Sequence, residues 1–63
     1  MNLETRDIII KKLLDAQEMV RDYESLSKET DDKEVAESFK NFAEESAMQA
    51  RKLQQLVDKY KKD

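Results

Sequence analysis

The chain of 63 residues contains neither glycine nor proline. Glycine supplies the positive backbone φ angles that many tight turns need, and proline punctuates loops. Their joint absence therefore argues against all-β and α/β folds. Charged residues make up 43% of the chain, and the good helix formers Ala, Glu, Lys, Leu, Gln and Met recur throughout it. The sequence thus predicts an all-α fold built from long, exposed helices.

One polar stretch divides the chain into two segments with helical periodicity. We expect a first helix over about residues 3–26, a loop over about 27–31, and a second helix over about 32–61. Because a short loop makes consecutive helices antiparallel neighbours, residues 1–63 are predicted to form a single domain, a two-helix antiparallel hairpin.

Capping residues are predicted at the start of both helices. Asn2 is the expected N-cap of the first helix. Asp31 is followed three residues later by Glu34, which resembles a capping box at the start of the second helix.

Apolar residues recur at alternating spacings of three and four, the pattern of a helix face that packs on another helix. We expect the core and the helix interfaces to be formed by Ile9, Ile10, Leu13, Leu14, Ala16, Val20, Tyr23, Phe39, Phe42, Ala43, Ala50, Leu53 and Val57. Ser46, Gln49 and Gln17 are polar residues on or beside this face. They are interpreted as a layer that fixes helix register, with a polar ligand pocket as the alternative.

The first helix carries more apolar surface than one neighbouring helix can cover. Ile8, Ile9 and Ile10 point in directions about 100° apart, and Leu13 and Leu14 extend the apolar arc. A chain this short buries only about 60% of the surface that its unfolded form exposes. Two hairpins pairing into a four-helix bundle would supply the missing burial. We therefore expect a homodimer or other homo-oligomer, with docking on a different protein as the alternative.

Charge is distributed unevenly along the chain. Residues 18–45, around the loop, hold 10 acidic and 4 basic residues, a net charge of −6. The remaining residues hold 5 acidic and 8 basic residues, a net charge of +3. Two paired hairpins are therefore expected to place their loops at opposite ends, where acidic and basic residues meet, although salt screens such charges over about 8–10 Å.

Catalytic chemistry has few candidate residues. The chain has no histidine and no cysteine, which removes the commonest general base, Ser–His pairs and thiolate zinc sites. We predict no enzyme, no catalytic, metal-binding or cofactor-binding residue, and no cofactor. Asp15, Glu18 and Asp22 stand at helical spacing and could in principle hold metal in a bundle. Basic residues three or four positions away favour a solvated acidic face instead.

The stretch from Leu14 to Val57 resembles one half of a rubrerythrin or related ferritin-like protein. It has an amphipathic helix with Tyr23 near its end, a short polar loop, and then the segment VAESFKNFAEESAMQARKLQQLV. Within that segment, residues 50–53 (Ala-Arg-Lys-Leu) are similar to the residues that come directly after the metal-binding Glu-x-x-His of the family.

The metal ligands of the family are missing from this chain. Alignment on Tyr23 and on residues 50–53 places the family's first glutamate at Ala16 and its Glu-x-x-His at Ser46 and Gln49. A shift by one residue brings Glu45 and Met48 to the second motif, again without histidine. The resemblance therefore implies a half-length bundle unit without a di-iron site, and a degenerate carboxylate metal-binding unit is one alternative function.

A second alternative is binding of RNA or DNA. In length and architecture the chain is similar to the small RNA-binding helical hairpins that control plasmid copy number and dimerise into four-helix bundles. Nucleic-acid binding needs a basic face, and Asp7, Asp15 and Asp58 dilute the basic residues near the chain ends. The four aromatic residues lie on the apolar face rather than on a free stacking platform. The net charge of −3 further disfavours this alternative.

The sequence favours a small non-catalytic module that self-associates, with a specific role that the residues do not identify. No apolar run approaches the ~20 residues of a membrane-spanning helix, and residue 1 onward shows no signal-peptide pattern. We therefore expect no membrane partner and a cytoplasmic location.

Overall fold

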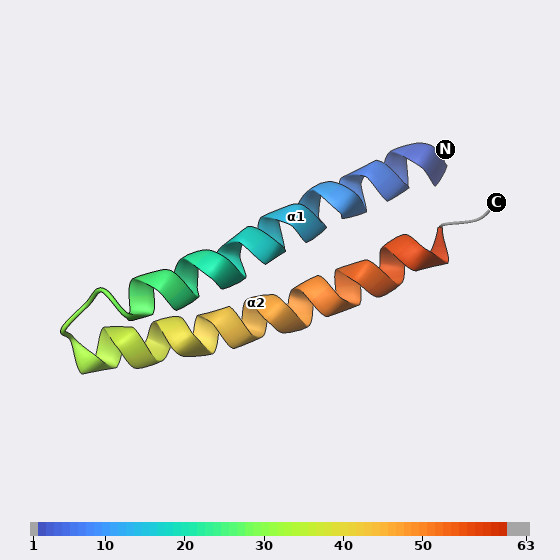
Figure 1. Ribbon diagram of the computed structural model, residues 1–63. Helices are drawn as coiled ribbons and strands as arrows, with labels where there is room; N and C mark the ends of the chain where they lie inside the picture. The colour runs from blue at the N-terminus through green and yellow to red at the C-terminus, as the bar shows by residue number, and fades with distance from the viewer. Residues whose placement is uncertain (1, 61–63) are drawn as a thin grey trace.

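The computed structural model describes residues 2–60, with side chains from residue 4 onward. Helix α1 (Asn2–Ser27) and helix α2 (Lys33–Lys59) run side by side in opposite directions, joined by one turn (Figure 1). The described part of the chain contains no strand. The hairpin is a rod with extents of 49 × 14 × 13 Å. The prediction of an all-α helical hairpin is confirmed.

The helix bounds differ from the predicted ones by one or two residues. Asn2 is the first residue of α1, and its predicted role as the N-cap of that helix stays a prediction, because its side chain lies outside the described part of the structure. Helix α1 continues to Ser27, and α2 ends at Lys59. The predicted end of the second helix, Lys61, lies outside the described residues.

Asp32, rather than Asp31, is the N-cap of α2. One carboxylate oxygen of Asp32, Oδ1, accepts a hydrogen bond of 3.1 Å from the backbone N–H of Val35. A capping box needs Glu or Gln three residues after the N-cap, and that position is Val35 here. Glu34 therefore cannot complete a capping box. The predicted Asp31–Glu34 box is wrong because the turn extends one residue further than expected.

The turn at residues 28–32 needs no glycine, because no residue in the described chain has a positive φ. The last turn of α1 tightens instead: the backbone N–H groups of Lys28 and Glu29 donate to carbonyls three residues earlier, at 3.1 and 3.0 Å. The hydroxyl of Ser27 donates to the carbonyl of Glu24 at 2.8 Å. Such i→i+3 bonds satisfy the carbonyls at a helix end without a left-handed residue.

The two helices pack through one continuous line of residues on each helix, which we call the seam. Its members are buried or half-buried and stand three and four residues apart: Arg6, Ile9, Leu13, Ala16, Val20, Tyr23 and Ser27 on α1, and Ala36, Phe39, Ala43, Ser46, Ala50, Leu53, Val57 and Tyr60 on α2. This spacing is the heptad pattern of a two-stranded coiled coil. Alanine recurs at every seventh position of α2 from residue 36 to residue 50, and with Ser46 it makes the middle of this side of the seam a run of short side chains.

The hydrophobic core is small. The apolar residues below a tenth exposed are Leu13, Ala16, Ala43 and Val57, and among the described residues no large side chain is fully buried. Aromatic contacts supplement this core near the loop. The ring of Tyr23 meets the rings of Phe39 and Phe42 edge-on, each at 5.3 Å between centroids. A single hairpin therefore gains modest stabilisation from burial.

Candidate functional site

Most of the residues predicted from the sequence to form the core or an interface do lie in or beside the seam. Leu13, Ala16, Ala43 and Val57 are buried. The half-buried ones are Ile9, Ile10, Val20, Tyr23, Phe39, Ala50 and Leu53.

Two of the predicted residues lie outside the hairpin core. Leu14 is 58% exposed and Phe42 is 40% exposed. Each stands next in sequence to a buried seam residue, about 100° further round the helix. Leu14 and Phe42 therefore do not belong to the core of the single hairpin, and their predicted place in an interface between hairpins stays a prediction.

The seam also contains Ser27 and Ala36, which were not in the predicted set, and Ser46, which the sequence placed on or beside the apolar face. Ser27 and Ser46 are buried despite their hydroxyl groups. The signal that could have identified Ser27 and Ala36 is the alternating spacing of three and four, continued through small and polar residues.

Large apolar side chains gather on one side of the seam, in the half of the hairpin near the loop. Met19, Leu26, Val35 and Phe42 are between 36% and 45% exposed. Met19 and Phe42 line the same shallow depression. Leu26 and Val35 lie seven residues from Met19 and Phe42 respectively, two turns along the same helix face. We call these four residues the apolar flank.

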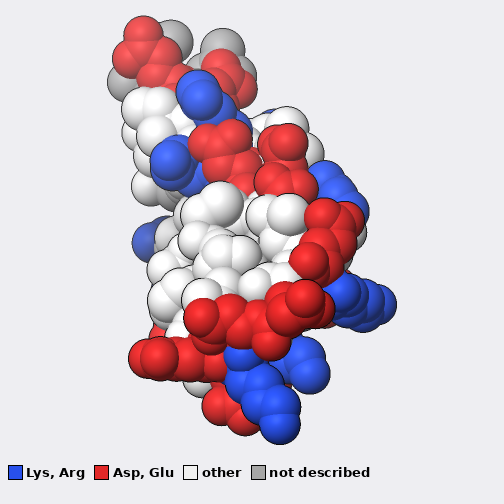
Figure 2. Space-filling view, turned by 90° about the vertical axis from the view of Figure 1, so that its left-hand side faces the viewer, with Lys and Arg blue, Asp and Glu red and all other residues white. Residues whose placement is uncertain are grey.

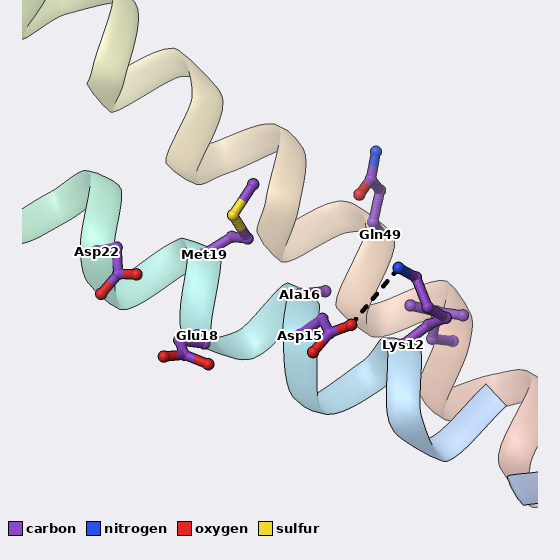
Figure 3. A pocket seen from close by; sticks show the side chains of 8 residues that line it. Lys12, Asp15, Ala16, Glu18, Met19, Asp22 and Gln49 are labelled. Atoms are coloured by element: carbon purple, nitrogen blue, oxygen red, sulfur yellow. Dashed lines mark ion pairs between the residues drawn. The ribbon is translucent and has the colours of Figure 1, made fainter. Parts of the chain in front are cut away.

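A second shallow depression lies on the same side of the seam as the apolar flank, nearer the middle of the hairpin. It has a volume of about 420 Å³, and Ala16 and Leu53 form part of its lining. Figure 3 shows Met19 of α1 reaching toward α2, with Gln49 on the facing helix. Lys12 pairs with Asp15 at 3.5 Å, and both side chains are largely exposed. The depression is an open surface groove between the helices.

Acidic residues lie beside the apolar flank, and basic residues lie farther along the same side of the hairpin, toward the chain ends. Asp22 and Glu45 line the depressions that contain Met19. Toward the chain ends, the same two helix faces carry Lys12 and Lys52, both exposed. Figure 2, which views the molecule from the loop side, shows an uncharged area bordered by carboxylates, with basic side chains around it.

The arrangement offers no evident chemistry. Within the described residues, no three side chains of His, Cys, Asp or Glu come together to hold a metal ion. Of the positions that the ferritin-like resemblance assigns to ligands, Ala16 and Ser46 are buried in the seam and Gln49 is exposed beside it. None of these side chains is a carboxylate or an imidazole, so they do not form the family's metal site.

Comparison with known proteins identifies no relative. No protein-family model matches the chain, and no curated protein or solved structure is significantly similar to it. The resemblance to half of a ferritin-like protein therefore stays a prediction. Within the described residues, neither helix is sufficiently long and apolar to span a membrane. A function has to be argued from the surface of the hairpin itself.

Proposed function

We propose that this hairpin is a non-catalytic interaction module that binds a second copy of itself through the apolar flank, giving a four-helix bundle. The observation that carries the proposal is the exposure of Met19, Leu26, Val35 and Phe42, each by more than a third, on one side of the seam. The depressions around Met19 are open, so a partner could reach these side chains without rearrangement of the hairpin.

Burial energetics favours a partner on this side. Covering apolar surface gains roughly 25 cal/mol per Å², and the hairpin alone buries only four apolar residues to below a tenth exposed. Contiguous apolar surface on a small protein is typical of an interaction site. Four large side chains on each of two copies would form a second core layer between the hairpins.

Charge favours a second copy over a different protein, and the area available on the hairpin suffices for one. The whole side of the rod, 49 by 14 Å, has a projected area of roughly 700 Å², close to the ~800 Å² per partner of a standard stable interface. Residues 18–45 carry a net charge of −6, whereas the remaining residues carry +3. Each copy thus brings both the acidic and the basic surface that the other copy needs.

The test is the mass in solution, measured by light scattering on a sizing column at two concentrations. The wild-type chain of 7.5 kDa is expected to elute with twice that mass. Met19→Glu places a charge on the apolar flank, where burial of a charge without an opposite partner is costly, and it should give a monomer.

Leu14→Glu is the matched control. It makes the same kind of change in the same helix, at a residue that is 58% exposed and that lies about 140° around α1 from Met19. This variant should keep the dimer mass. A wild-type monomer at both concentrations, or a Met19→Glu dimer as stable as that of wild type, would contradict the proposal. Circular dichroism would verify that both variants are helical.

No observation on the described residues favours metal binding or nucleic-acid binding over self-association. The cytoplasmic location inferred from the sequence stays a prediction.

A further inference from the structure

We infer that the two hairpins pair with their loops at opposite ends, so that the acidic rim of each apolar flank faces the lysines of the partner. This inference rests on the proposed self-association and names its geometry. It is carried by the way residue type changes along the side of the hairpin that bears the apolar flank.

On α1, this side changes from apolar to basic toward the open end of the hairpin. Leu26, Met19 and Lys12 follow one another at intervals of seven residues and so share one face of the helix. Beside them, Asp22 and Asp15 form a second line with the same interval, continued by Ile8, which is 64% exposed. The face is therefore apolar with an acidic rim near the loop, and mixed with a lysine near the open end.

Helix α2 repeats the change. Val35 and Phe42 are followed at the same interval by Gln49 and then by Leu56, which is half-buried. Next to this line, Glu45 is followed seven residues later by Lys52, and both are exposed. Charge thus reverses within two turns on α2, and on α1 the change from Asp22 to Lys12 takes ten residues, with Asp15 paired to Lys12 in between.

The point of reversal lies close to the middle of the rod. Gln49 of α2 and Asp15 of α1 line the same depression, so they lie at about the same level, and Asp15 stands near the middle of α1 (Asn2–Ser27). A two-fold axis that crosses the rod at this level relates the two copies. Every contact then occurs twice, because if residue i of one copy contacts residue j of the other, residue j of the first also contacts residue i of the second. Glu45 of each copy, four residues from this level, then comes opposite Lys12 and Lys52 of the other copy, which stand three residues beyond it, and Asp22 lies about one turn farther from the axis.

The same axis also matches apolar surface. Phe42 of one copy comes to the level of the partner's Leu56 and Ile8, which supply half-buried and exposed apolar surface of the open end, and Met19 lies about one turn nearer the axis. A pair with both loops at the same end would instead bring Asp22 and Glu45 of one copy to the level of the same acidic residues of the other copy. Like charges in such a contact repel and suppress that arrangement.

Distance measurements between spin labels distinguish the two orientations. The chain has no cysteine, so a single introduced cysteine labels one position in each copy. Glu29→Cys puts the label in the turn, and Met48→Cys puts it near the middle of α2, on an exposed residue outside the apolar flank. Pulsed electron resonance would measure the separation between the two labels in each assembly.

With loops opposed, the labels at position 29 should be separated by about the length of the rod, 49 Å. With loops together, they should be within about two helix diameters, roughly 20–25 Å. The label at position 48 should report a short distance in either orientation. A short distance at both positions would overturn the opposed orientation while leaving self-association intact, and no dipolar coupling at position 48 would overturn both.

Charge reversal tests the physical cause. The double variant Lys12→Glu/Lys52→Glu should weaken the opposed dimer by about tenfold, since several exposed ion pairs would become repulsive contacts. Asp22→Lys/Glu45→Lys should weaken it similarly, and an equimolar mixture of the two variants should restore wild-type association. With loops together, each double variant would only exchange one like-charge contact for another, so unchanged dissociation constants for both would overturn the inference.

Discussion

The seam predicts that replacement by alanine lowers the free energy of unfolding much more at Leu13 than at the neighbouring Leu14. Leu13 is 8% exposed, whereas Leu14 is 58% exposed. Replacement of a buried leucine by alanine costs about 2–5 kcal/mol, depending on how well the site can collapse. In a seam only two helices thick, neighbours relax easily, so we expect Leu13→Ala to cost about 2–3 kcal/mol of unfolding free energy. For Leu14→Ala, with less than half of the side chain buried, we expect below ~1 kcal/mol.

The pair of variants is matched in everything except burial. Both replace leucine by alanine in the interior of α1, so the change in helix propensity cancels. Urea unfolding followed by circular dichroism at 222 nm would give the two free energies. All samples must have one protein concentration, because assembly adds to apparent stability. Equal losses, or a larger loss for Leu14→Ala, would refute the seam register and move Leu14 into the core.

Two further substitutions test local features. Asp32→Ala removes the cap of α2 and should cost about 1 kcal/mol in urea unfolding, whereas Asp31→Ala, one residue earlier, should cost little; equal effects would mean that the cap is assigned to the wrong aspartate. Tyr23→Leu removes the edge-on contacts to two phenylalanine rings at 5.3 Å and should cost about 1 kcal/mol or more, while Tyr23→Phe keeps the ring and should stay near wild type in the same assay.

Much of the hairpin was predictable because helical periodicity is a local property. The spacing of Ile9, Leu13, Ala16, Val20 and Tyr23 identified the α1 half of the seam from the sequence alone. On α1 the seam positions between Ile9 and Tyr23 are all apolar, so the spacing alone marked that line, although Ile8, Leu14, Met19 and Leu26 lie off it. The absence of glycine and proline excluded the folds that would compete with this pattern.

Helix α2 was harder to predict because two apolar lines lie beside each other on it. One contains Val35 and Phe42, and the other contains Ala36 and Ala43. Side-chain size favours the first line as the core, yet Ala43 is 4% exposed and Phe42 is 40% exposed. Short side chains occupy the line nearest the other helix, because there the backbones approach most closely. Periodicity therefore identified the apolar side of α2, but it did not show which of the two lines packs against α1.

The N-cap of α2 and the apolar flank could not be predicted from the sequence, for two different reasons. Two consecutive aspartates precede α2, and the choice between Asp31 and Asp32 depends on where the turn ends in space. The apolar flank depends on which apolar residues the hairpin leaves uncovered, and this is determined only by the packed structure. Met19 and Leu26 appear in the sequence simply as part of a wide apolar arc on the first helix.

The turn also protects this chain against exchange of helices between copies. Domain swapping would require residues 28–32 to straighten so that α1 and α2 form one long helix. The last seam residue of α1, Ser27, and the first of α2, Ala36, are nine residues apart, which is about 900° of helix rotation, or two and a half turns. In a straightened chain the two halves of the seam would therefore face opposite sides. A swapped pair could not bury both halves along one line, so the spacing across the turn disfavours runaway assembly into chains of exchanged helices.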